Sequence, residues 1–136
     1  MSLVVPDISE PVLLEYMLRT TSFPNYVLKL YSNNYTPAQG TLLADFTEAT
    51  FTGYTGTTFA RSAWGTASAN PVTNKGEISA SQISWTAGSG QTVYGYYVVS
   101  DDGTPKLLWA ELFDTSKALQ NNDILNITVN FTLASA

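Results

Sequence analysis

Apolar and polar residues alternate most strictly near the end of the chain. Every second residue from Leu125 to Leu133 is apolar, and the residues between them are Asn or Thr. Successive side chains of a β-strand point to opposite faces, so a period of two is typical of a strand that buries one face. The pattern predicts one strand over 125–133 with its apolar face in the core.

The most apolar segments of the chain are 93–99 (VYGYYVV) and 107–113 (LLWAELF). The stretch between them contains the Asp102-Gly103 step, which favours a tight reversal. We therefore expect a β-hairpin through the centre of the domain. Gly95, among four bulky neighbours, predicts a bulge or a close backbone contact.

Other segments with strand-like patterns lie earlier in the chain. They are 26–31, 42–46, 59–64 and 78–86, separated by stretches rich in Gly, Ser, Thr, Asn and Pro that predict turns and loops. About seven or eight short strands joined by long polar loops are typical of two packed sheets. The pattern predicts a mainly β, single-domain β-sandwich or jelly-roll-like fold with one N-terminal helix.

The single helix is predicted before the first strand. Apolar residues recur there at helical spacing, at Val12, Leu13, Tyr16 and Met17, with Leu14 and Leu18 widening the apolar stripe. Ser9 supplies a capping hydroxyl, and the Phe23-Pro24 step ends the helix because a residue before proline is extended. Either the helix packs on the domain's own sheet or it docks onto a neighbouring subunit. We divide the chain into an N-terminal arm and helix over 1–24 and a β-sandwich body over 25–136.

The amino-acid composition excludes several kinds of chemistry. The 136-residue chain has no histidine and no cysteine. It therefore lacks the usual Ser-His-Asp triad, a thiolate nucleophile, a disulfide and any metal site with His or Cys ligands. Its glycines form no phosphate-binding motif. We predict a protein that is not an enzyme, with no catalytic residues, no cofactor and no bound metal.

Two acidic features could be mistaken for functional sites. Glu111 lies in an apolar strand and Asp114 follows it, whereas a glycosidase needs two carboxylates about 5–10 Å apart in a cleft. Nothing in the sequence supplies that cleft, so we expect Glu111 to pair with a basic residue such as Arg61 or to point outward at an edge. The Asp-Asp-Gly run at 101–103 lacks the alternating oxygen ligands of a calcium loop and is interpreted as a turn.

Charge limits the possible partners. Only 12% of the residues are charged, the net charge is −5, and the six basic residues are scattered singly. No cluster of them could neutralise a run of phosphates or bind an anionic membrane, so we predict neither nucleic acid nor membrane as a partner. So few charges favour association with other subunits. The sequence starts without a signal-peptide pattern and contains no apolar run of about 18 residues, which predicts synthesis in a cytoplasm.

Four segments carry a further signal, a resemblance to known proteins. They are LKLYSNNYTP (28–37), ADFTEATFTGY (44–54), VYGYYVVSDDGTPKLLWAELF (93–113) and NDILNITVNFTL (122–133). They resemble a family of small structural proteins of tailed phages, the capsid cement or decoration proteins. The resemblance implies a virion protein, made in the host cytoplasm, that binds the outer surface of the capsid lattice as an oligomer and stabilises it. Its implied partners are the major capsid protein and further copies of itself, as a homotrimer.

The best-known decoration proteins resemble this chain only in size and composition, so other functions stay open. A tail or head–tail structural component is one alternative, and a carbohydrate-binding module of a tail fibre is another. The carbohydrate alternative predicts an exposed aromatic shelf that includes Tyr35, Tyr54 or Trp64.

We expect the contacts of the assembly on the apolar N-terminal segment and on aromatic residues outside the central strands. The candidates are Leu3, Val4, Val5, Leu13, Leu14, Met17, Leu18, Tyr35, Tyr54 and Trp64. In this hypothesis three copies associate through aromatic strand faces while the N-terminal segment lies on the capsid. Deleting residues 1–18 should then abolish capsid binding and leave the β body folded.

Overall fold

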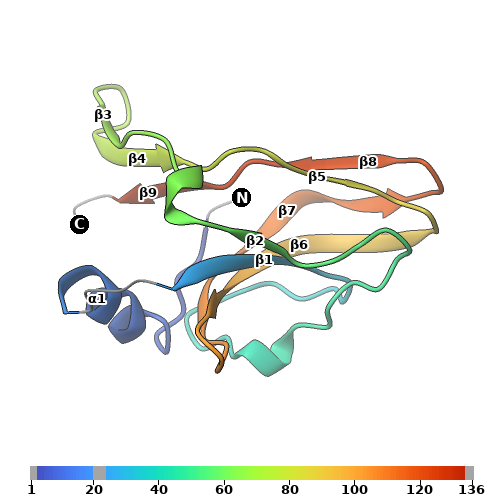
Figure 1. Cartoon of the computed structure of the whole chain (residues 1–136), viewed down its shortest axis with the longest axis horizontal. Helices are drawn as coiled ribbons and strands as arrows, with labels where there is room; N and C mark the ends of the chain where they lie inside the picture. The colour runs from blue at the N-terminus through green and yellow to red at the C-terminus, as the bar shows by residue number, and fades with distance from the viewer. Residues whose placement is uncertain (1–2, 20–23, 134–136) are drawn as a thin grey trace.

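A computed structural model of the protein describes residues 3–19 and 24–133 and has a mainly β architecture (Figure 1). One α-helix, α1 (Glu10–Leu18), precedes the strands, as predicted. The strands are β1 (Asn25–Tyr31), β2 (Thr57–Phe59), β3 (Ser68–Asn70), β4 (Lys75–Ser79), β5 (Ile83–Thr86), β6 (Gln91–Asp101), β7 (Leu107–Leu119), β8 (Ile124–Ile127) and β9 (Asn130–Leu133). Two short 3-10 helices, η1 (Leu43–Asp45) and η2 (Arg61–Ala63), lie between β1 and β3.

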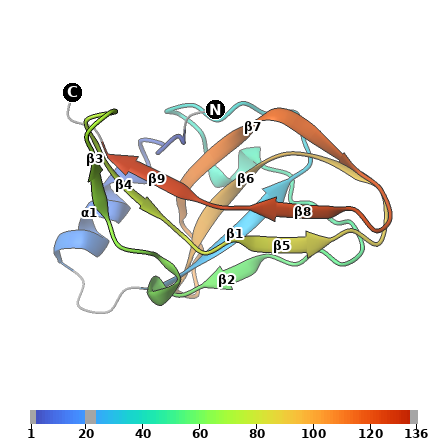
Figure 2. The same ribbon diagram turned by 90° about the horizontal axis from the view of Figure 1, so that it is seen from above.

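The strands form two layers. One layer is a four-stranded antiparallel sheet in the order β2-β1-β6-β7, and the other contains two smaller sheets, β3-β4-β9 and β5-β8. The two small sheets continue one another along the molecule (Figure 2), because β4 leads into β5 and β8 leads into β9. The largest cluster of buried side chains joins the layers, with Leu28 and Val98 from one and Trp85 and Leu125 from the other. The predicted β-sandwich-like fold is confirmed.

Both long strands of the second layer are interrupted where the chain passes between the small sheets. The sequence predicted continuous strands over 78–86 and 125–133, which is wrong at these two points. The interruptions lie opposite one another, since the Ala80 N–H donates a hydrogen bond to the Val129 carbonyl oxygen at 2.9 Å. The predicted apolar face is buried as far as Val129, but Leu133 is 70% exposed. Beyond the break, β9 pairs only with β4 and extends toward the end of the molecule where α1 lies (Figure 1).

β6 and β7 form the predicted central hairpin, and both of its faces are buried. One face belongs to the core between the layers. The other is covered by the segment after β1, where the Phe46 ring stacks on Tyr97 with centroids 4.6 Å apart. The predicted strand over 42–46 is wrong, because η1 forms there and Asp45 accepts a hydrogen bond of 2.7 Å from the Leu42 N–H. The aromatic strand faces that we expected to join three copies are therefore covered within one chain.

The predicted strand over 59–64 ends at Phe59, because η2 follows it. The turn is closed by a hydrogen bond from the Trp64 N–H to the Arg61 carbonyl oxygen at 3.2 Å, and Trp64 then forms an isolated β-bridge with Ala80. The tight turn places Trp64 at the end of the sandwich, beside the break in the second layer.

The N-terminal segment is attached to the β body. Val4 forms an antiparallel bridge with Ala110 of β7, with N–H···O distances of 2.8 and 2.9 Å. Tyr16 of α1 is buried against the core cluster. Removing residues 1–18 would thus uncover part of the β7 edge as well as any partner surface, so a truncation would not test partner binding alone.

The start of α1 differs from the predicted capping arrangement. Ser9 precedes the helix, but its φ and ψ angles of −89° and −27° are already helical, whereas a capping residue is extended. Its hydroxyl is buried and makes no hydrogen bond to a described residue. The Ser9 side chain therefore does not cap the helix.

Gly95 is the point of closest approach between β1, β6 and β7, as the sequence predicted. A Cβ atom there would overlap the Glu111 carbonyl oxygen and would lie 2.5 Å from the Tyr31 hydroxyl oxygen. The pairing of β6 with β7 also shifts register between Val93 and Gly95, which is the expected bulge. Only a residue without a side chain fits this position.

We expect Gly95→Ala to lower the free energy of unfolding by about 3 kcal/mol, because the backbone and Tyr31 must move to admit a methyl group. Urea denaturation measures the change. Gly40→Ala is the control, since a Cβ at Gly40 would have no atom within 4 Å. Equal stability of the two variants would contradict the close contact.

Candidate functional site

Exposed apolar side chains are concentrated at one end of the sandwich. Of the eight large apolar side chains that are exposed in the described residues, four lie on α1 or just before it, two at the nearby β3–β4 turn and the end of β9, and two elsewhere. The first four are Ile8, Leu14, Met17 and Leu18. Val72 lies in the β3–β4 turn and Leu133 at the end of β9, and the other two are Leu42 and Ile124. α1, the β3–β4 hairpin and the end of β9 lie toward the same end of the molecule, with α1 on the side of the four-stranded sheet and the β3–β4 turn on the opposite side (Figure 1). We call this region the apolar end.

α1 is apolar on two sides, and only one side packs on the body. Leu13 is half-buried against the core cluster, and Tyr16 is buried. Leu14 and Leu18 point away from the body and are 56% and 81% exposed. The interpretation that the helix packs on the domain's own sheet thus holds for one side of α1. The other side is left uncovered, and its docking onto a neighbouring subunit stays a prediction.

A network of polar side chains positions the helix. The Tyr16 hydroxyl donates a hydrogen bond of 2.8 Å to Asp102 in the turn between β6 and β7. The same carboxylate accepts hydrogen bonds from the Lys106 ammonium at 2.8 Å and from the Ser100 hydroxyl at 2.9 Å. These donors, Lys106 first, lower the pKa of Asp102 to about 2. The charged form of Asp102 therefore ties α1 to the central hairpin.

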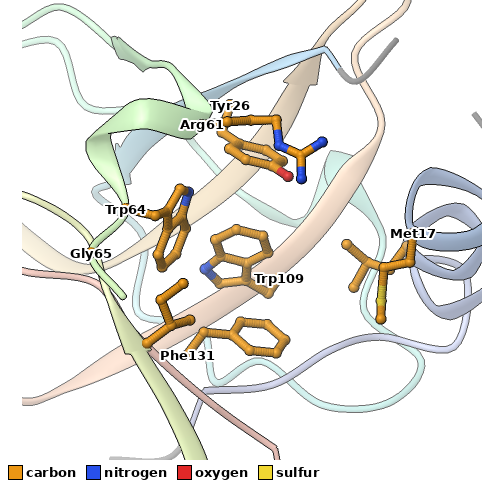
Figure 3. Close-up of a pocket in the computed structure, with 9 residues that line it drawn as sticks. Met17, Tyr26, Arg61, Trp64, Gly65, Trp109 and Phe131 are labelled. Carbon is orange, nitrogen blue, oxygen red and sulfur yellow. The ribbon is translucent and has the colours of Figure 1, made fainter. Parts of the chain in front are cut away.

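A groove of about 350 Å³ lies between α1 and the end of the sandwich (Figure 3). Its walls are mostly apolar and aromatic, and they include Leu13, Met17, Tyr26, Trp64, Trp109 and Phe131. Neighbouring rings contact one another, with centroid distances of 6.0 Å between Trp64 and Trp109 and 5.4 Å between Trp109 and Phe131. Arg61 lies at the rim. The groove suits an apolar side chain.

Trp109 is the most buried aromatic wall of the groove, 3% exposed. Its indole N–H is buried without a hydrogen-bond acceptor in bonding geometry among the described residues. Burial raises the pKa of the Tyr96 hydroxyl, and the Trp109 side chain acts in the opposite direction.

The predicted contact residues of the N-terminal segment divide into two groups. Leu3 and Val5 are half-buried and pack against the core cluster, and Val4 is engaged in its bridge to β7. Leu13 and Met17 line the groove, and Leu14, Met17 and Leu18 are exposed at the apolar end. The second group is the one that is open to a partner.

The predicted loop aromatics are less exposed than expected. Tyr35 is half-buried, with its hydroxyl 3.0 Å from the Thr41 hydroxyl, and its ring packs on Phe46. Tyr54 is half-buried as well: its hydroxyl donates to Glu48 at 3.0 Å and accepts from the Leu30 N–H at 3.0 Å. Burial raises the pKa of Tyr54. Tyr54 fastens its loop to β1, whereas the Tyr35 hydroxyl is held within the segment that follows β1.

Trp64 does reach the groove, where it meets residues that the sequence did not single out. Tyr26, Trp109 and Phe131 belong to strands, where an aromatic residue is more often part of the core than of a contact surface. Val72 and Leu133 were also missed, since one lies in a polar turn and the other ends an alternating strand. The sequence signals for this site were the broad apolar stripe of α1 and Trp64.

Glu111 occupies a second, smaller hollow of about 210 Å³ that Lys117 also lines. It accepts a hydrogen bond of 2.6 Å from the buried Tyr96 hydroxyl. Arg61, its expected partner, lines the groove instead. Burial, followed by the hydrogen bond to Glu111, raises the pKa of Tyr96. The carboxylate is satisfied by a structural hydrogen bond.

Within residues 3–19 and 24–133, no group of three or more acidic side chains is arranged to hold a metal ion. The same residues contain no helix of the length and apolar character needed to cross a membrane.

The chain is a mainly β protein with a β-sandwich-like fold and one helix. No model of a known protein family matches its sequence, and a search of curated proteins finds no relative. Its candidate site is made of the exposed side of α1 and the adjoining aromatic groove.

We expect Asp102→Asn to lower the free energy of unfolding by about 1 kcal/mol at neutral pH, because the charged acceptor is lost. The folded-state pKa of Asp102 lies below its usual value of 3.8. Its contribution is therefore complete above about pH 5 and is lost as the pH falls toward about 2, where the unfolded chain binds the proton first. The stability difference between wild type and Asp102→Asn should shrink over this range.

Urea denaturation at a series of pH values measures this difference. Asp101→Asn is the control, since it removes the same charge from the neighbouring residue at the end of β6. A difference that stays constant from neutral pH to acid would contradict the role of the carboxylate.

Proposed function

We propose that this protein is a non-enzymatic assembly subunit, and specifically a capsid cement or decoration protein of a tailed phage. In this role it binds the outer surface of the capsid lattice as an oligomer and stabilises the lattice. The observation that supports an assembly function is the apolar end, where Leu14, Met17 and Leu18 are exposed on α1 beside an aromatic groove.

The apolar end is unusual for a small protein that stays alone in water. Isolated apolar residues are common on protein surfaces, but three that are exposed on one short helix next to an aromatic groove are typical of a contact site. Burying one such Leu side chain contributes about 1.5–3 kcal/mol. With only 12% charged residues, the surface also offers little electrostatic protection against association.

The phage assignment is supported by the resemblance of the segments 28–37, 44–54, 93–113 and 122–133 to small virion proteins. It makes the major capsid protein the expected partner. The homotrimer contact that we expected on aromatic strand faces has lost its support, because those faces are covered by the chain itself. The apolar end replaces them as the proposed contact surface of the assembly.

The alternatives differ in how well the side chains support them. A tail or head–tail component would use the same apolar end. A carbohydrate-binding module needs exposed ring faces together with polar groups that bind hydroxyls. The three aromatic residues expected to form such a surface do not provide it. Tyr35 and Tyr54 form hydrogen bonds within the chain, and Trp64 lies in a groove with mostly apolar walls.

We expect the chain to be a stoichiometric component of particles purified from the phage whose genome encodes it. Mass spectrometry of the particles detects the chain, and cryo-electron microscopy should place it on the outside of the capsid lattice. Its absence from the particles would overturn the proposal. Density on the tail would replace the cement function by the tail alternative.

We expect Leu14→Glu to weaken rebinding to particles stripped of this protein by about tenfold or more, because a charge enters an apolar contact. Co-sedimentation with the particles measures the affinity. Ile124→Glu is the matched control, since Ile124 is 64% exposed and lies at the start of β8, away from α1. Equal loss in both variants would contradict the role of the apolar end.

A further inference from the structure

We infer that the free edge of β8 and β9 takes up an extended strand of a partner protein, which pairs with this edge and covers the hollow beside it. We call residues 125–133 along this edge the open edge. The strand that fits is neutral and alternates apolar with small polar residues. The contact centres on β8, at the other end of the molecule from α1 (Figure 1), so the inference goes beyond the proposed function and does not depend on the phage assignment.

The open edge carries backbone groups that the fold leaves unpaired. β8 pairs only with β5 and β9 only with β4, so each strand has a neighbour on one side within the described part of the chain. A strand with one neighbour leaves about half of its N–H and C=O groups free. Thr128, between β8 and β9, makes no backbone hydrogen bond to another described residue, because the second layer is interrupted there. Another extended backbone matches such a row of donors and acceptors.

The open edge lacks the charges that usually protect a free strand. Residues 125–133 (LNITVNFTL) contain no charged residue, no proline and no glycine. The edge of β7 differs, because Val4 pairs there with Ala110 and the exposed Asp114 and Lys117 follow. β2 and β3, which also lie at edges of their sheets, have only three residues each. A longer edge without charges or proline pairs readily with a further strand.

The second layer is narrower than the first beside the open edge. The two strands β5 and β8 lie opposite the four-stranded sheet, and β7 lies beyond the edge of β8 when the molecule is seen from above (Figure 2). The hollow of about 210 Å³ lies at this place, between Phe113 and Lys117 of β7 and residues 125–128. A strand that pairs with β8 would therefore lie over β7 and close this hollow.

The side chains around the open edge specify the chemistry of the partner strand. Asn126 and Thr128 are exposed on the outer side, so small polar residues fit beside them. On the inner side, the half-buried ring of Phe113 favours an apolar residue. Glu111 and Lys117 line the hollow together and their charges cancel, so a neutral strand is favoured over a charged one.

A second copy of the chain does not supply this strand from its own open edge. In each copy β7 lies beyond β8 (Figure 2), so the two β7 strands would collide before two open edges could form one continuous sheet. The strand that fits comes from a segment without a second layer beneath it. The partner is therefore a protein chain with an exposed extended segment.

Hydrogen exchange of the full-length protein in the presence of a synthetic peptide tests the inference. The probe is the peptide LNITVNFTL, because it is neutral and has the required alternation, and it is used at concentrations at which it stays monomeric. We expect the probe to slow amide exchange of residues 125–133 at least tenfold. A peptide with the same residues in an order without alternation should leave the exchange unchanged. Equal exchange with and without the probe would overturn the inference.

Thr128→Pro tests whether the backbone of the open edge makes the contact. Proline removes an N–H that the fold does not use, and the preceding Ile127 is already extended in β8, so the folded protein should tolerate the substitution. We expect the dissociation constant of the probe to rise at least tenfold. Thr128→Ala keeps the N–H and should bind like wild type. Fluorescence anisotropy of the labelled probe measures both affinities, and equal affinities would overturn the backbone contact.

Thr128→Lys is a second variant that does not change the backbone. Its charge stays in water in the free protein but enters a neutral contact when the probe binds, so we expect binding to weaken at least tenfold. Thr86→Lys places the same charge at an exposed position of β5, away from the open edge, and should bind like wild type. Equal weakening by both substitutions would overturn the site. Binding of the probe by a chain that is absent from phage particles would support this inference and overturn only the cement function.

Discussion

The double burial of the β6–β7 hairpin is the constraint on which the rest of the structure depends. A strand pair that is apolar on both faces must be covered twice, or a large apolar surface stays in water. The second layer of strands covers one face, and the segment after β1, anchored by Phe46 on Tyr97, covers the other. Gly95 allows this arrangement, because it lets Tyr31 approach the hairpin at the bulge. Most of the aromatic residues are used in these two covers.

This use of the aromatic residues determines where contacts with other molecules can form. Tyr35 and Tyr54, which lie in loops, are drawn inward by hydroxyl partners on the covering segments. These two rings are therefore not free to contact other molecules on the sides of the sandwich. At the end of the sandwich the four-stranded sheet stops while β4 and β9 continue, and α1 covers only part of the gap. The groove and the exposed side of α1 are thus one consequence of unequal layer lengths.

Short-range patterns in the sequence predicted the strands and the helix well, but they predicted poorly where these elements lie in the fold. The period of two over 125–133 and the apolar runs at 93–99 and 107–113 identified strands. Burial of one or both faces of a strand determines which neighbouring residues are apolar, so the local sequence shows it. The break at Val129 could not be predicted from neighbouring residues, since it lies opposite Ala80, some 50 residues away in the sequence. The apolar end was predictable only in part: the stripe of α1 is visible in the sequence, but its convergence with Trp64 and Phe131 depends on tertiary structure.

The position of α1 shows why point substitutions are better tests of this surface than removal of the segment. Tyr16 is held by Asp102, and Val4 pairs with β7, so the inner side of the N-terminal segment belongs to the fold. Leu14 and Leu18 on the outer side contribute no comparable packing, and a charge placed there remains in water in the free protein. The folded monomer should therefore tolerate such a charge, whereas a contact that buries these leucines must desolvate it. A loss of association without loss of stability is the property that separates a contact surface from a part of the core.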